Sequence, residues 1–87
     1  MQENRRPLKD VLIGAKELFV LPPTVEITGN TQATIQGAKG IIEYTDELIR
    51  VNLGEMEACF YGGNLSICSL TQDSLEIKGS IERVEYR

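Results

Sequence analysis

Residues 61–86 read YGGNLSICSLTQDSLEIKGSIERVEY, and this stretch decides the fold. Apolar side chains take every second position in its runs, as at Leu65 and Ile67. Alternation with a period of two is typical of a β-strand that has one buried face. The runs stop at small or polar residues that suit tight turns, and we interpret Gly62-Gly63 as a hairpin turn. The stretch therefore predicts an antiparallel meander of short strands.

The same alternation runs through residues 24–60, where Gly, Asn and Asp again interrupt it. About eight such segments leave no room for crossover helices, so the pairing must be mainly antiparallel. We predict an all-β fold, a small antiparallel β-sandwich with an immunoglobulin-like meander of about seven or eight strands, or else a flattened barrel. A β-solenoid is the alternative, because an isoleucine, a polar residue and a glycine recur at 27–29, 35–37 and 77–79. The residues predicted to face inward are Val25, Ile27, Ile35, Ile42, Ile49, Val51, Phe60, Leu65, Ile67, Leu75, Ile77 and Val84.

The residues before the first strand follow a different period. Apolar side chains spaced by three and four between Leu8 and Leu18 predict a short amphipathic helix. Pro22-Pro23 must end it, since a proline has no amide hydrogen and disfavours the α conformation in the residue before it. We predict an N-terminal tail and helix over 1–23 and a β-sandwich domain over 24–87. The apolar stripe is interpreted as a cover for one end of the domain, with contact to a partner or a membrane as the alternative.

Composition narrows the class of protein. The 87 residues are enough for one domain, and 41% apolar with 25% charged residues is typical of a folded, water-soluble chain. A net charge of −4 disfavours nucleic acid, which requires clustered basic side chains. The longest apolar run, Leu18–Leu21, is far shorter than the roughly 20 residues that span a bilayer. The basic start has no apolar signal region, so we predict a cytoplasmic location.

The residues that usually carry catalysis are scarce. Without histidine there is no imidazole base and no histidine metal ligand, so a base would have to be a carboxylate. The acidic candidates fall at the outward positions of strands, which are usually solvated surface. They are Glu26, Glu43, Glu57, Glu76, Glu82 and Glu85. We predict no catalytic, cofactor-binding or metal-binding residues, with a carboxylate- or metal-dependent enzyme as the rival class.

Turn acids, tyrosines and cysteines are interpreted in the same way. Asp46-Glu47 and Asp73 occupy turns, where carboxylates bond to nearby backbone amides. The three tyrosines, Tyr44, Tyr61 and Tyr86, are too scattered for a base-stacking platform and are assigned to the core or its rim. Cys59 and Cys68 are too few for a disulfide framework or a zinc site and are expected to be free thiols, although they flank the predicted hairpin turn.

Four blocks, taken in order, resemble a known family. They are LPPTVEITG at 21–29, QGAKGIIEYTDELIRVNLG at 36–54, GGNLSICSL at 62–70 and SLEIKGSIERVEY at 74–86. Their order and spacing are similar to the YabP/YqfC family of sporulation proteins of endospore-forming Firmicutes. The likeness covers about residues 18–86, and the N-terminal segment looks more like YqfC than YabP.

The resemblance implies a context and no chemistry. Members of the family are small β-sandwich proteins of the mother cell without a known catalytic activity, and their genes lie beside genes for membrane proteins. We therefore expect a non-catalytic protein-interaction module without a small-molecule substrate or cofactor. Its expected partner is a membrane-associated sporulation protein, and its expected place is the mother-cell cytoplasm, peripheral to a membrane. A self-assembling structural component of the developing spore, a homo-oligomer, is the alternative.

Overall fold

A computed structural model describes residues 22–87, which form six β-strands and no helix. The predicted N-terminal helix lies outside the described residues. The strands are β1 (Thr24–Thr28), β2 (Gln32–Gln36), β3 (Gly40–Tyr44), β4 (Leu48–Asn52), β5 (Glu57–Leu70) and β6 (Ser74–Tyr86). All neighbouring strands pair antiparallel, in the order β1-β2-β6-β5-β4-β3. The all-β antiparallel class is confirmed, and the parallel solenoid is wrong.

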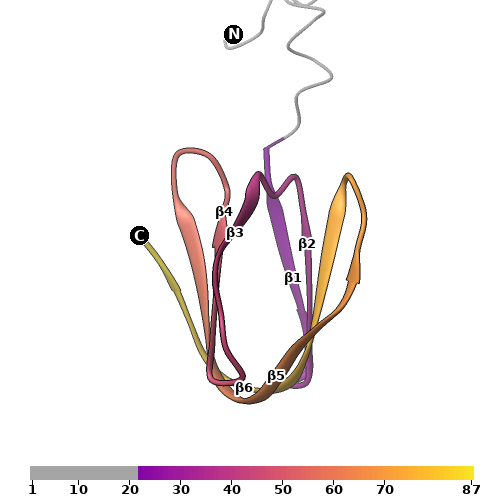
Figure 1. The fold of residues 1–87 in the computed structure, drawn as a ribbon, viewed down its shortest axis with the longest axis vertical. Helices are drawn as coiled ribbons and strands as arrows, with labels where there is room; N and C mark the ends of the chain where they lie inside the picture. Colours follow the sequence, from indigo (N-terminus) through magenta and orange to yellow (C-terminus); the bar gives the residue numbers. More distant parts are fainter. Residues whose placement is uncertain (1–21) are drawn as a thin grey trace, which may run out of the picture.

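The sheet is strongly bent. β5 and β6 are 14 and 13 residues long and run through both arms of the fold, rising from a common bend at the bottom of Figure 1. β3 and β4 extend the arm that holds the first half of β5, and β1 and β2 extend the arm that holds the first half of β6. One bent sheet encloses the core, so a sandwich of two separate sheets with an immunoglobulin-like meander is not confirmed.

The Gly62-Gly63 hairpin turn is a wrong prediction. Both glycines lie inside β5, which continues from Glu57 to Leu70 while β6 pairs along both of its halves. A glycine pair suits a tight turn, but it equally suits a strand that must bend sharply where another backbone approaches. Four predicted strand segments therefore merge into β5 and β6, and the described part of the chain has six strands where about seven or eight were expected.

Close backbone contact at the bend explains why glycine stands there. A Cβ atom added to Gly62 would lie 1.8 Å from the carbonyl oxygen of Ser80, and one added to Gly79 would lie 2.6 Å from that of Asn64. Gly79 also has a φ of +141°, which L side chains rarely adopt. β5 and β6 thus cross the bend pressed against each other, with no room for a side chain at these two positions.

Both short hairpins anchor the bend through backbone hydrogen bonds. Gly62 donates its N–H to the carbonyl of Glu47 at 3.1 Å, in the turn between β3 and β4. Gly79 donates its N–H to the carbonyl of Thr31 at 3.1 Å, in the turn between β1 and β2. At the bend, these two N–H groups therefore bond to carbonyls of the hairpin turns instead of to the neighbouring long strand. Buried and half-buried backbone groups require such partners.

The apolar core lies between the two arms. Side chains from β2, β4 and both halves of β5 and β6 form one buried cluster. Its members are Ala33, Ile35, Ile49, Val51, Leu53, Ala58, Phe60, Leu65, Leu75, Ile77 and Ile81. Seven of the twelve residues predicted to face inward are in this cluster, and Val25, Ile67 and Val84 pack against it half-buried. The period of two therefore predicts the core face of each central strand.

Two inward predictions fail at the edges of the sheet. Ile42 is 44% exposed because the β3–β4 register shifts between Ile41 and Glu43, which places Ile41 opposite Val51. A bulge of this kind moves one residue out of the alternation. Ile27 is 40% exposed because β1 is the outermost strand and has a neighbour on one side only.

The two cysteines lie in different surroundings. Both are free thiols on β5; Cys59 is fully buried and Cys68 is exposed. We expect a small alkylating reagent to modify Cys68 in the folded protein and Cys59 only on unfolding, because burial denies the reagent access. Fragment-ion mass spectrometry would resolve the two sites. Equal modification rates under native conditions would contradict this placement.

Candidate interaction surfaces

Two of the candidate glutamates meet at one arginine on the outer face of the sheet. Arg50 donates from Nη1 to Glu43 at 3.1 Å, and from Nε and Nη2 to Glu57 at 3.0–3.1 Å. The hydrogen bonds that Arg50 donates to Glu43 and then to Glu57 raise the pKa of Arg50 above its usual value, against the opposing effect of partial desolvation. Both carboxylates are thus ion-paired across three neighbouring strands. This arrangement links β3, β4 and β5.

The remaining candidate glutamates do not gather into one site. Glu76 accepts hydrogen bonds from Gln32 and from the thiol of Cys68. Glu85 accepts one from the Tyr61 hydroxyl at 3.4 Å. Glu26 is exposed at β1 and lines a shallow depression of its own strand and β2. The structure therefore joins Glu43 with Glu57 and keeps the other acidic candidates apart.

The acidic turns are held by threonine rather than by their carboxylates. The Thr45 hydroxyl accepts the N–H of Glu47 at 3.2 Å and of Leu48 at 2.9 Å. The Thr71 hydroxyl accepts the N–H of Asp73 in the same way, at 3.2 Å. The turn positions predicted for Asp46-Glu47 and Asp73 are confirmed, but the hydroxyl of a preceding threonine accepts the backbone N–H groups that the carboxylates were expected to bond. Within residues 22–87 no three acidic or cysteine side chains gather as metal ligands would.

The tyrosines take three separate positions. Tyr61 stacks under the Arg83 guanidinium at 4.0 Å, and its hydroxyl accepts a hydrogen bond from Arg87 at 2.8 Å. Tyr44 lies on β3, where its hydroxyl accepts the N–H of Ile67 at 2.9 Å and so connects the edge of β3 to the second half of β5. Tyr86 is 55% exposed at the end of β6. Within residues 22–87, the hydroxyls of Tyr44 and Tyr61 form hydrogen bonds and that of Tyr86 forms none.

The end of β6 forms a sheet edge among the described residues. β2 pairs with β6 over Ser74–Lys78, and Ile81 donates its N–H to the carbonyl of Asn30 at 2.7 Å. Within residues 22–87, the segment 82–86 therefore has β5 as its sole ladder partner. Val84 in this segment is half-buried against the core, whereas Tyr86 projects into solvent. An unpaired strand edge of this kind is a template for another strand.

Hydrogen-bond alternation shows which backbone groups this edge presents. Glu57 and Arg87 exchange both backbone hydrogen bonds, at 2.9 and 3.1 Å. Bonded and non-bonded pairs alternate along an antiparallel ladder, so the pairs that contain Tyr86 and Val84 are non-bonded. The N–H and C=O groups of Val84 and Tyr86 therefore point away from β5, out of the sheet edge.

The edge of β1 has the same arrangement. Gly37 donates its N–H to the carbonyl of Asp73 at 3.1 Å, between β2 and β6. Bonded and non-bonded pairs alternate along the β2–β6 ladder from this pair, so the pair of Thr34 with Glu76 is non-bonded. The backbone N–H and C=O groups of Thr34 therefore point away from β6 and toward β1. Val25 and Ile27 then direct theirs away from β2. The two edges share outward backbone groups next to partly exposed apolar side chains.

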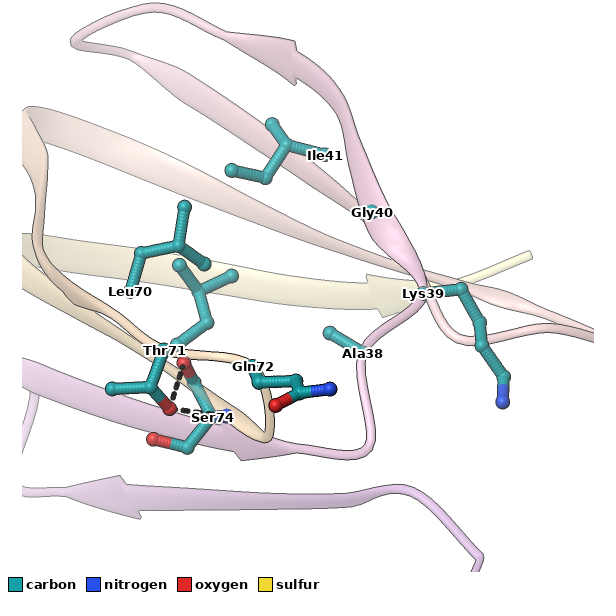
Figure 2. Close-up of a pocket in the computed structure, with 9 residues that line it drawn as sticks. Ala38, Lys39, Gly40, Ile41, Leu70, Thr71, Gln72 and Ser74 are labelled. Carbon is teal, nitrogen blue, oxygen red and sulfur yellow. Dashed lines mark hydrogen bonds between the residues drawn. The ribbon is translucent and has the colours of Figure 1, made fainter.

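A groove of about 220 Å³ opens where the start of β3 approaches the end of β5. We call it the β3–β5 groove and define it by Ala38, Ile41, Leu70, Thr71 and Leu75. Figure 2 shows Ile41 and Leu70 extending from opposite strands into the same space. Ile41 is 38% and Leu70 63% exposed, so this groove presents apolar surface to solvent. None of the elements in residues 22–87 is a helix long and apolar enough to cross a membrane.

Comparison with known proteins decides the family. A model of the YabP family matches residues 21–87, a range that includes all the described residues. The chain belongs to the YabP family. Comparisons with the curated proteins and with the solved structures gave no match. The resemblance to YabP/YqfC proteins is confirmed, and the preference for YqfC within the family stays a prediction.

Family membership indicates a sporulation-related protein. The sequence pattern identified the strands of this YabP-family chain but not its edges, because a strand at an edge and one at the centre of a sheet can alternate identically. The alternation places Val84 and Tyr86 in the last strand but gives no sign of which of their backbone groups are unpaired. That knowledge requires the strand order and the register.

Proposed function

We propose that this YabP-family chain is a non-catalytic module that binds a partner protein during sporulation. It does so by adding an extended segment of the partner to the edge at the end of β6. The observation that carries the proposal is the outward orientation of the N–H and C=O groups of Val84 and Tyr86. In strand addition, such main-chain groups supply affinity, and neighbouring side-chain positions supply specificity. The exposed Tyr86 ring is the side chain best placed for the second role.

The proposed context is the mother cell, with a membrane-associated sporulation protein as the partner. The support comes from the family and from the likeness to proteins whose genes lie beside genes for membrane proteins. The chain would act from the cytoplasmic side as a peripheral component. Its net charge of −4 makes a protein surface a better anchor than anionic lipid.

Two substitutions at Tyr86 separate backbone pairing from side-chain contact. Tyr86→Ala removes the ring and keeps the N–H, whereas Tyr86→Pro removes both, at an edge position where proline breaks no ladder hydrogen bond. We expect the proline variant to recover at least about tenfold less membrane partner than the alanine variant, a difference of about 1.4 kcal/mol. The measurement is quantitative mass spectrometry of proteins co-purified with the tagged chain from detergent-solubilised membranes of sporulating cells.

Thermal unfolding of both variants serves as the control for folding. Equal partner recovery with the two variants would contradict pairing at β6, and the corresponding pair Ile27→Pro and Ile27→Ala would then test β1. If neither edge variant affected recovery, or no membrane protein co-purified with the unaltered chain, the binding function would be rejected.

Self-assembly is the second candidate, because a chain with more than one unpaired strand edge can pair copy to copy without closing. Sedimentation velocity across a range of protein concentrations distinguishes the two functions. Open-ended growth of the purified chain that Tyr86→Pro abolishes would favour self-assembly. A species of constant size would favour a partner of a different sequence.

A further inference from the structure

The β3–β5 groove leaves apolar side chains exposed beside the point where the chain enters the domain. A second depression, of about 690 Å³, adjoins it and shares Ala38, Lys39 and Gln72 with it. Pro22 lines this second depression. The two depressions therefore adjoin each other, with Pro22 lining one and Leu70 lining the other. Any segment that precedes Pro22 is tethered at the second depression.

The sequence before Pro22 has the properties of an occupant. Leu8, Val11, Leu12, Ala15 and Leu18 repeat at helical spacing and predict one apolar stripe. At 1.5 Å per residue, a helix over 8–18 would be about 16 Å long. Residues 19–21 could extend by about 10 Å between that helix and Pro22. The helix and its tether together span about 26 Å, counted outward from Pro22, which itself lines the second depression.

Charge does not oppose this pairing. Residues 8–18 carry two basic and two acidic side chains, so the segment that bears the stripe is neutral. Residues 22–87 carry five basic against ten acidic side chains, and the charged residue that lines the β3–β5 groove is Lys39. A covalent tether of a few residues gives the segment an effective concentration in the millimolar range, which exceeds that of a second copy or a dilute partner.

We propose that residues 8–18 pack their apolar stripe into the β3–β5 groove of the same chain, against Ile41 and Leu70. This contact covers the most exposed leucine of the described residues. This contact does not involve the edge at the end of β6. It needs no partner protein, so it can be tested with the purified chain alone.

Limited trypsin digestion of the full chain tests the proposal. A docked segment must open before it is cleaved, so Lys9 and Lys16 should be cut about tenfold more slowly than in a synthetic peptide of residues 1–21. Leu70→Asp should restore the peptide's rate, since the exposed position tolerates the change in folding but the charge opposes apolar docking. Met56→Asp, at a position 43% exposed in the loop between β4 and β5, is the matched control and should leave the protection intact.

Protection of Lys9 and Lys16 that is independent of protein concentration supports docking within one chain. Protection that rises with concentration assigns the groove to a second copy and overturns the proposal. Cleavage of the unaltered chain at the peptide's rate also overturns the proposal, and a different protein then becomes the candidate occupant of the groove. Retained protection in Leu70→Asp would place the segment elsewhere on the domain. None of these outcomes depends on Tyr86 or on recovery of a membrane partner.

Discussion

Gly62→Ala is expected to lower the free energy of unfolding by about 3 kcal/mol or more, enough to unfold a large share of so small a domain. A Cβ atom at this position would lie 1.8 Å from the carbonyl oxygen of Ser80, so the β5 and β6 backbones would have to separate at the bend. The same movement would strain the hydrogen bond from Gly62 to Glu47. Urea unfolding followed by circular dichroism measures the effect.

Gly63→Ala provides the matched control one residue away. A Cβ atom there meets nothing within 4 Å, and its φ lies outside the left-handed region. We expect a change of less than about 1 kcal/mol, because the half-buried position has room for the methyl group and alanine replaces a more flexible glycine. If both variants unfolded at the same urea concentration, the close crossing of β5 and β6 at Gly62 would be refuted.

Ile77→Ala is expected to cost about 2–5 kcal/mol, because Ile77 is fully buried at the centre of the core and truncation leaves a cavity. Ile67 faces Ile77 across the β5–β6 ladder but is only half-buried. Ile67→Ala should therefore cost less than half as much as Ile77→Ala. Equal losses, measured by the same urea titration, would show that the second half of β5 is more enclosed than the structure describes.

The fold class could be predicted from the sequence because a period of two is a local property. Ile35, Val51 and Ile77 alternate with polar neighbours, and all three are buried on central strands. Ile27 alternates in the same way and is exposed, because its strand is outermost. Position in the strand order depends on contacts between distant residues, which alternation does not record.

The bend escaped prediction for a related reason. The Gly62-Gly63 pair has the composition of a turn, and only the backbone of Ser80 beside it shows that a bend is required instead. To predict the ion pairs of Arg50 with Glu43 and Glu57, one must know the strand register and the position of the bulge in β3. Sequence reasoning placed these glutamates correctly on an outward face, but could not bring them together.

Amide hydrogen exchange of the chain bound to its purified membrane partner tests strand addition at β6 most directly. In the free protein the amides of Val84 and Tyr86 should exchange quickly, while that of Glu85, which faces β5, should be protected. Binding by strand addition predicts that Val84 and Tyr86 become protected and that Glu85 stays protected. Unchanged exchange at Val84 and Tyr86 in a saturated complex would contradict it.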